Sequence, residues 1–192
     1  MFCHCESAEG GCGNLYFHYI LENILSQIKQ ANRYDILGLM AIEGDGFMVG
    51  YLSISSIEVI TTANFHARHH GQKAVGLEHL LYGVVRAKTP MAENVLSNLG
   101  ITEERIEQAL IKTEGGFSTS SPRRAIPLTP EAKEVLGLAT GLAEEHKRLA
   151  TPEDILLTST MVPMTMRFGE VLHSLGVSYP QYRNFIQDIF RE

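Results

Sequence analysis

Two groups of side chains in this sequence could bind a metal ion or do thiol chemistry, and the histidines form the first. His66, His69 and His70 lie at helical spacing, and His79 follows in the next apolar segment. Two histidines at positions i and i+4 of a helix can share a metal ion. However, no third ligand is fixed by the spacing, and the H-E-x-x-H pattern is absent. We expect no metal here, and interpret the histidines as a solvated, polar helix end.

The cysteines form the second group. Cys3, Cys5 and Cys12 all lie in the first thirteen residues, with His4 between the first two. Their spacing does not match the common zinc patterns, and a nucleophilic cysteine needs a base held by a fold. Three cysteines at one end argue against a disulfide framework and favour a cytosolic setting. A metal- or thiol-dependent enzyme that uses the His and Cys clusters is the alternative function, whereas the main interpretation needs no cofactor.

A glutamate stands twice at the start of an apolar helix, as Glu78 in "AVGLEHLL" and as Glu153 in "LATPEDILL". An acidic residue in the first turn interacts favourably with the helix dipole, by about 0.3–1 kcal/mol. In the second stretch Thr151, Pro152 and Asp154 make an N-terminal cap that is almost complete without Glu153. The same carboxylates could instead hold a guanidinium group by paired, charge-assisted hydrogen bonds.

The helices that must position these glutamates recur with a period of about 75 residues, which is an internal repeat. Glu153 follows Glu78 at that period, Gly176 repeats the helix-ending Gly100, and the helix that carries Glu78 is predicted over 77–87. Each copy has four amphipathic helices whose apolar faces need a partner. We therefore expect a mainly α fold, with two four-helix repeats packed as one pseudo-symmetric domain.

The chain divides by composition into segments of different character. The segments are a flexible, cysteine-containing lead (1–13), an N-terminal extension (14–50) and a double repeat (52–192), which comprises repeat one (52–113), a linker (114–127) and repeat two (128–192). The extension has a helical pattern followed by two β-prone runs around "EGDG", which predict a hairpin. Gly, Ser and Pro dominate the linker, in which Arg123 and Arg124 are interpreted as solvated charge. Ser55 with Glu58 has capping-box spacing and is predicted to open repeat one, as Thr129 opens repeat two.

Charge and hydropathy argue against two kinds of partner. Sixteen basic and 22 acidic residues give a net charge of −6, which disfavours nucleic-acid binding. The longest apolar runs, such as "ILGLMAI", are too short to span a bilayer, and we see no secretory signal at the N-terminus. We expect no nucleic acid and no membrane among the partners, and a cytoplasmic location.

The repeated stretches resemble the Clp N-terminal repeat, which occurs twice at the front of Clp/Hsp100 unfoldases of the ClpC and ClpA type. The similar stretches are "ARHHGQKAVGLEHLLYGVVR" and "AENVLSNLGI" in the first copy, and "LTPEAKEVLGLA", "ATPEDILL" and "VLHSLGV" in the second. The resemblance covers 52–192 and leaves out residues 1–50. It implies a non-catalytic helical module that docks substrates and adaptors, with a Clp ATPase or the ClpP protease core as partner. The chain has no G-x-x-x-x-G-K-[ST] phosphate loop, so we expect a stand-alone accessory protein or the N-terminal part of a Clp ATPase.

The resemblance also implies binding residues. In Gram-positive ClpC the glutamates that match Glu78 and Glu153 receive phosphoarginine-tagged substrates, and a hydroxyl at the start of each repeat takes part. The matching hydroxyls are Thr129 and Ser53, for which Ser55 competes. The family's "GTEH" reads "GLEH" in the first copy and "TPED" in the second, so only the first copy keeps the glycine and Glu78 is the stronger candidate. Residues 14–50 lie outside the resemblance and could cover a repeat face or form a homodimer contact.

Overall fold

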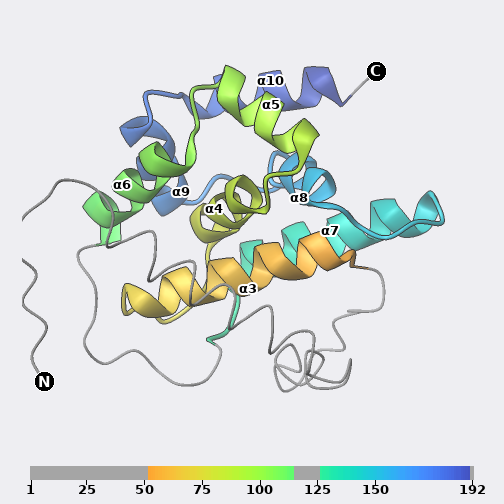
Figure 1. Ribbon diagram of the computed structural model, residues 1–192, viewed down its shortest axis with the longest axis horizontal. Helices are drawn as coiled ribbons and strands as arrows, with labels where there is room; N and C mark the ends of the chain where they lie inside the picture. The colour runs from red at the N-terminus through yellow and green to blue at the C-terminus, as the bar shows by residue number, and fades with distance from the viewer. Residues whose placement is uncertain (1–51, 115–125, 191–192) are drawn as a thin grey trace, which may run out of the picture. The chain divides into compact units, whose positions relative to one another are not determined.

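Eight α-helices account for most of the residues that the computed structural model describes, 52–114 and 126–190 (Figure 1). Repeat one consists of α3 (Ile54–His69), α4 (Leu77–Ala87), α5 (Pro90–Asn98) and α6 (Glu103–Glu114). Repeat two consists of α7 (Pro130–Glu145), α8 (Pro152–Thr158), α9 (Met166–Ser174) and α10 (Tyr179–Ile189). The predicted fold class, mainly α with two four-helix repeats, is confirmed. The predictions about the cysteine lead, the hairpin, Arg123 and Arg124 lie outside the described residues.

The first helix of each repeat begins at a hydroxyl residue in the matching position. The Ser53 hydroxyl accepts a hydrogen bond from the Ser56 N–H, and the Thr129 hydroxyl accepts one from the Ala132 N–H, both at 3.2 Å. Each bond satisfies one of the backbone donors that a helix start leaves unpaired. The prediction that Ser55 opens repeat one is wrong, because Ser55 already lies inside α3 and Ser53 is the N-cap.

Two short parallel bridges tie the start of each repeat to the other repeat. Leu52 pairs with Ala150, and Val75 pairs with Leu128. The Ser53 N–H donates to the Ala150 carbonyl at 2.9 Å, and the Thr129 N–H donates to the Val75 carbonyl at 2.9 Å. The segment just before the first helix of one repeat therefore lies beside the segment just before the second helix of the other.

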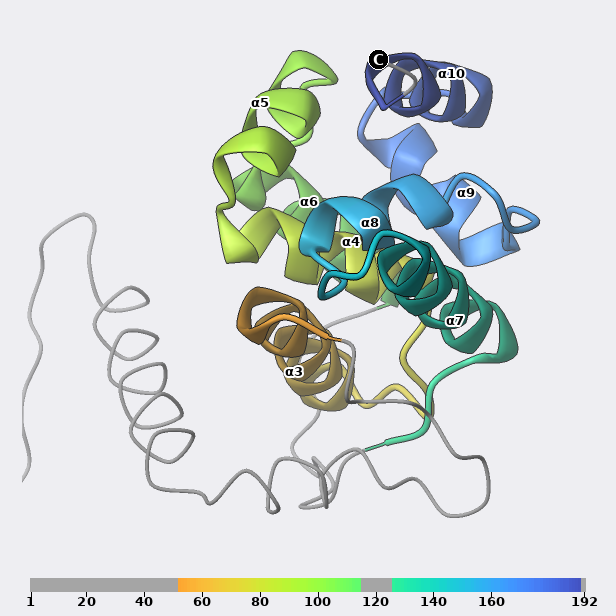
Figure 2. The ribbon, with the colours of Figure 1, turned by 90° about the vertical axis from the view of Figure 1, so that its right-hand side faces the viewer.

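The second helices lie in the middle of the domain, packed against the first helices and against each other (Figure 2). Where α4 crosses α3, a Cβ atom on Gly83 would lie 2.3 Å from the Val59 carbonyl oxygen. At the matching crossing of α8 and α7, the Thr158 hydroxyl donates to the Val135 carbonyl at 3.0 Å. At this crossing repeat one therefore has a glycine, which leaves room for the backbone carbonyl of the first helix. Repeat two has a threonine, which donates a hydrogen bond to the matching carbonyl.

The third helices end in the same way in both copies. Gly100 and Gly176 adopt left-handed backbone angles, with φ of 69° and 77°, as expected for residues that follow a helix C-terminus. The Arg105 guanidinium donates to the carbonyls of Gly100, at 2.5 Å, and of Leu175, at 2.6 Å, so it links the two equivalent ends.

Within the described part of the chain, no helix is both long and apolar enough to cross a membrane.

Candidate functional site

The crossed bridges bring each N-cap hydroxyl residue to the start of the other repeat's glutamate helix. Ser53 adjoins Ala150, two residues before α8 begins, and Thr129 adjoins Val75, two residues before α4 begins. The four residues named from the sequence therefore fall into two junctions, each with one residue from either repeat. We call them junction A (Thr129 and Glu78) and junction B (Ser53 and Glu153). The sequence did not predict which hydroxyl lies beside which glutamate, and the structure forms each junction from both repeats.

At junction A the Glu78 carboxylate is buried, with only 4% of the residue exposed. It folds back over Gly76, where a Cβ atom would lie 2.3 Å from Glu78 Oε1, and it lies 3.2 Å from His79 Nδ1. Burial raises the pKa of Glu78, but the hydrogen bond and charge of His79, its own backbone N–H and the charge of Arg167 together hold the pKa below its usual value. Glu78 is therefore an ionised carboxylate held inside the protein.

At junction B the Glu153 carboxylate takes a different position, and the residue is half-buried. Glu153 Oε1 accepts a hydrogen bond of 2.5 Å from the hydroxyl of Thr89, the N-cap residue of α5 in repeat one. Thr89 could not be predicted from the sequence, because nothing in the spacing relates a residue before α5 to one in α8. The contact adds a second polar group from repeat one to this junction.

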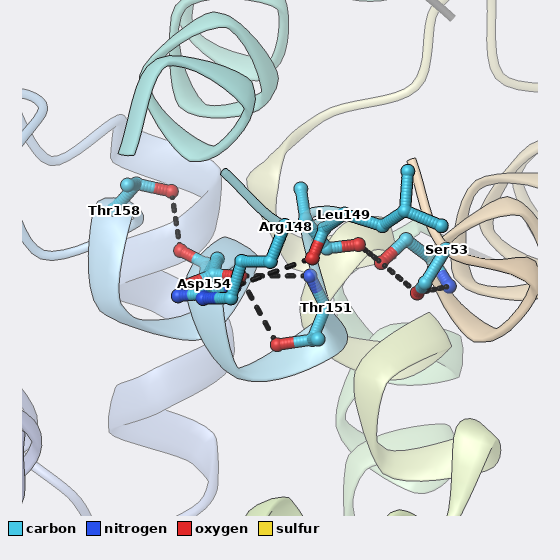
Figure 3. A network of polar contacts seen from close by, with 8 residues as sticks. Ser53, Arg148, Leu149, Thr151, Asp154 and Thr158 are labelled. Atoms are coloured by element: carbon cyan, nitrogen blue, oxygen red, sulfur yellow. Dashed lines mark hydrogen bonds and ion pairs between the residues drawn. The ribbon is translucent and has the colours of Figure 1, made fainter. Parts of the chain in front are cut away.

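The cap of α8 uses Asp154 in place of Glu153, as the sequence predicted. Asp154 Oδ2 accepts from the Thr151 N–H at 2.8 Å and from the Thr151 hydroxyl at 3.1 Å (Figure 3). Arg148 donates to both carboxylate oxygens, at 2.5 and 2.7 Å. Burial raises the pKa of Asp154, but the bonds from Arg148 and Thr151 outweigh it and lower the pKa below its usual value. Glu153 is therefore not needed for the cap.

His79 occupies the position in α4 that Asp154 occupies in α8. The Gly76 N–H donates to His79 Nδ1 at 3.1 Å, just as the Thr151 N–H donates to Asp154. Both second helices are thus capped by the side chain of their third residue, the reciprocal half of a capping box. In both copies the glutamate is the residue before that capping group.

Three of the four histidines predicted to form a solvated helix end are buried instead, so that interpretation is wrong for them, whereas His69 is half-buried. His66 and His70 expose 6% and 5% of their surface, and His79 is fully buried. The His66 ring stacks on His70, with ring centroids 4.4 Å apart, and lies 4.4 Å from the Tyr82 ring and 5.9 Å from the His79 ring. The apolar face of α4 covers this end of α3, which a single-helix pattern could not reveal.

His66 is the most perturbed of these groups. Burial, together with the charges of His70, His79 and His69, lowers its pKa from 6.5 to about 3, so the imidazole is neutral at physiological pH. Neither ring nitrogen of His66 has a hydrogen-bond partner. Among the residues described, no group of three or more His, Cys, Asp or Glu side chains could hold a metal ion. The cysteines that the metal or thiol alternative invokes lie outside the described residues.

The fold and the two junctions describe a helical domain of two repeats, with a hydroxyl and a carboxylate residue at each place where the repeats meet. The family "Clp repeat (R) N-terminal domain" matches residues 52–175, which is more than half of the chain. This chain belongs to that family, as the sequence stretches predicted.

Curated relatives extend the match across the same region. The ClpA homolog of the Clp protease ATP-binding subunit from Cyanidium caldarium is 33% identical over 139 residues, which is 68% of this chain and 15% of that protein. ClpC/MecB of Bacillus subtilis, a negative regulator of genetic competence, is 32% identical over 143 residues, or 71% of this chain and 16% of that protein. The chain thus spans about a sixth of the relatives that it matches.

Solved structures show the same fold at lower sequence identity. The N-terminal domain of the ClpD chaperone from Arabidopsis thaliana superposes with a TM-score of 0.57 at 22% identity, over 77% of this chain and all of that one. The Hsp104 N-terminal domain from Candida albicans gives a TM-score of 0.54 at 14% identity, over 72% of this chain and 91% of that one. These similarities support the helical architecture.

Proposed function

We propose that this chain is a non-catalytic docking module of the Clp chaperone and protease system, which binds substrate proteins or adaptors. It would act either as a stand-alone accessory protein or as the N-terminal part of a longer Clp ATPase. Its partners would be a Clp ATPase or the ClpP protease core on one side and client proteins on the other. Family membership and relatives that are Clp ATP-binding subunits support this proposal.

The observation that carries the proposal is the arrangement of polar groups at the two junctions. Each junction combines an N-cap hydroxyl from one repeat with an acidic residue near the start of the other repeat's second helix. A carboxylate can hold a guanidinium by two parallel hydrogen bonds. A helix N-terminus can accept a phosphate through its unpaired N–H groups. The site residues that we propose are Glu78, Glu153, Thr129 and Ser53.

A guanidinium that carries a phosphate needs both kinds of group at once, so we propose phosphoarginine on client proteins as the ligand. Calorimetric titration of free phosphoarginine into the full chain tests this directly. We expect saturable binding to the wild type and loss of binding in the Glu78→Ala/Glu153→Ala double variant. Glu134→Ala, which removes an exposed carboxylate from α7, is the matched control and should bind as the wild type does. Equal binding by the double variant, or no binding by the wild type, would refute the ligand assignment.

A further inference from the structure

The two junctions differ in whether their carboxylate can reach a ligand. Glu78 is buried over Gly76, whereas Glu153 is half-buried and repeat two has Thr151 at the position that matches Gly76. The backbone at Gly76 is extended, with φ of −97° and ψ of −177°, which any residue can adopt. Gly76 is therefore not required by the backbone. Because Gly76 has no side chain, the Glu78 carboxylate can occupy the space where a Cβ atom would otherwise lie.

His79 Nδ1 faces two groups with opposite requirements. The Gly76 N–H, 3.1 Å away, needs a lone pair on that nitrogen, whereas Glu78 Oε1, 3.2 Å away, needs a proton on it. One nitrogen cannot satisfy both. When Nδ1 carries the proton, the carboxylate is held and the N–H loses its acceptor. When Nδ1 carries the lone pair, the helix cap is complete, but the Glu78 carboxylate keeps only its own backbone N–H and the charge of Arg167, and the loss of its side-chain donor favours its exposure to solvent.

We propose that Gly76 and His79 withhold the Glu78 carboxylate, so that repeat one presents its docking group only after the carboxylate leaves His79. His79 is a positioning residue, because it acts on the ligand only through Glu78. The charge of Arg167 of repeat two also favours the ionised form of Glu78. Repeat two has Thr151 and Asp154 at the matching positions, so no histidine withholds Glu153, which is half-buried and accepts a hydrogen bond from the Thr89 hydroxyl. The difference in accessibility between the Glu78 and Glu153 carboxylates follows from the geometry alone. Its consequence for ligand binding rests on the proposed function.

Carboxyl labelling measures the withholding without any ligand. Treatment of the full chain with a water-soluble carbodiimide and glycinamide, followed by mass spectrometry, gives a rate for each carboxylate. We expect Glu78 to react severalfold more slowly than Glu153, with the exposed Glu134 as the reference for full reactivity. Equal rates at Glu78 and Glu153 in the wild type would overturn the proposal.

Substitution of repeat-two residues into repeat one tests the cause. In Gly76→Thr the three atoms nearest to the new Cβ all belong to the flexible end of Glu78, so we expect the fold to persist and Glu78 to react as fast as Glu153. His79→Asp removes the proton donor and keeps a capping acceptor, and should have the same effect. The reciprocal Thr151→Gly should leave the rate at Glu153 unchanged, because Asp154 offers no proton. An unchanged rate at Glu78 in a folded Gly76→Thr variant would overturn the proposal.

Phosphoarginine titration of the Gly76→Thr variant separates the two ideas. If Glu78 becomes reactive and phosphoarginine binds more tightly than to the wild type, both the withholding and the proposed ligand are supported. If Glu78 becomes reactive and phosphoarginine binds no more tightly than to the wild type, the withholding is supported and the assignment of phosphoarginine to Glu78 fails. If Glu78 stays unreactive, the withholding fails, whatever the titration shows.

Discussion

At the scale of single residues, His66 has a pKa that lies far below its ordinary value. Burial and neighbouring histidines keep it neutral in the folded protein, with a pKa of about 3 against an ordinary value of 6.5. The unfolded chain binds a proton below about pH 6.5 that the folded chain refuses. His66 therefore contributes no pH dependence above that value and favours unfolding as the pH falls from there towards about 3.

Replacement of His66 by leucine should remove this part of the acid sensitivity. The wild type should lose stability below pH 6.5 by up to roughly 1.4 kcal/mol per pH unit from this residue alone, and His66→Leu should lose correspondingly less. Urea unfolding at a series of pH values measures the difference. His173→Leu, which removes an exposed histidine of α9, is the control and should keep the slope of the wild type. Parallel pH profiles for wild type and His66→Leu would contradict the interpretation.

Asp154 and Arg148 form an ion pair whose members should differ in importance. Asp154 is buried and also caps α8 through two bonds from Thr151, whereas the Arg148 side chain is 43% exposed. We expect Asp154→Ala to lower the free energy of unfolding by about 1–3 kcal/mol and Arg148→Ala by about 1 kcal/mol or less. Urea unfolding at neutral pH measures both. A larger loss for Arg148→Ala would mean that the ion pair, rather than the cap, holds this junction.

At the scale of the helices, the sequence predicted what local patterns determine. The helix over 77–87 was placed correctly, because Gly76 precedes an apolar run with a clear period. Ser55, and not Ser53, was predicted to begin the first helix of repeat one. The start of α3 depends in part on a hydrogen bond from Ser53 to Ala150, far along the chain, which the sequence does not reveal. Burial of the histidines and of Glu78 was also missed, since both depend on which element covers the residue and not on its spacing.

The crossing of α3 and α4 should tolerate no side chain at Gly83. A Cβ atom there would meet the Val59 carbonyl oxygen at 2.3 Å, so Gly83→Ala must push the helices apart and should cost about 1–3 kcal/mol. Gly137 in α7 has open space around it, and Gly137→Ala should instead stabilise by about 0.5–1 kcal/mol. Thermal unfolding followed by circular dichroism compares the pair. Equal effects would show that helix propensity, and not the crossing, decides both.

At the scale of the whole domain, the two repeats depend on each other for both structure and site. The Leu52–Ala150 and Val75–Leu128 bridges cross between repeats, and α4 packs on α8. The sequence predicted that two four-helix units share one domain, because each has an apolar face to bury. It could not predict the crossed pairing, since the period of about 75 residues is equally compatible with two repeats that do not exchange contacts.

Unfolding of the double repeat should therefore be a single cooperative transition. We expect urea curves from far-ultraviolet circular dichroism and tyrosine fluorescence to coincide, because neither repeat completes its bridges alone. A chain that ends after α6 should lack the helical content of repeat one in the whole protein. Two separated transitions, or a stable isolated repeat one, would contradict this dependence.

Recovery of partners from the protein's own cells tests the central claim most directly. The full chain, tagged and cross-linked in place, is purified beside its Glu78→Ala/Glu153→Ala variant, and the captured proteins are identified by mass spectrometry. The account predicts a Clp ATPase, the ClpP protease core or their client proteins with the wild type, and fewer clients with the variant. Recovery of no Clp component and no client with the wild type would contradict it.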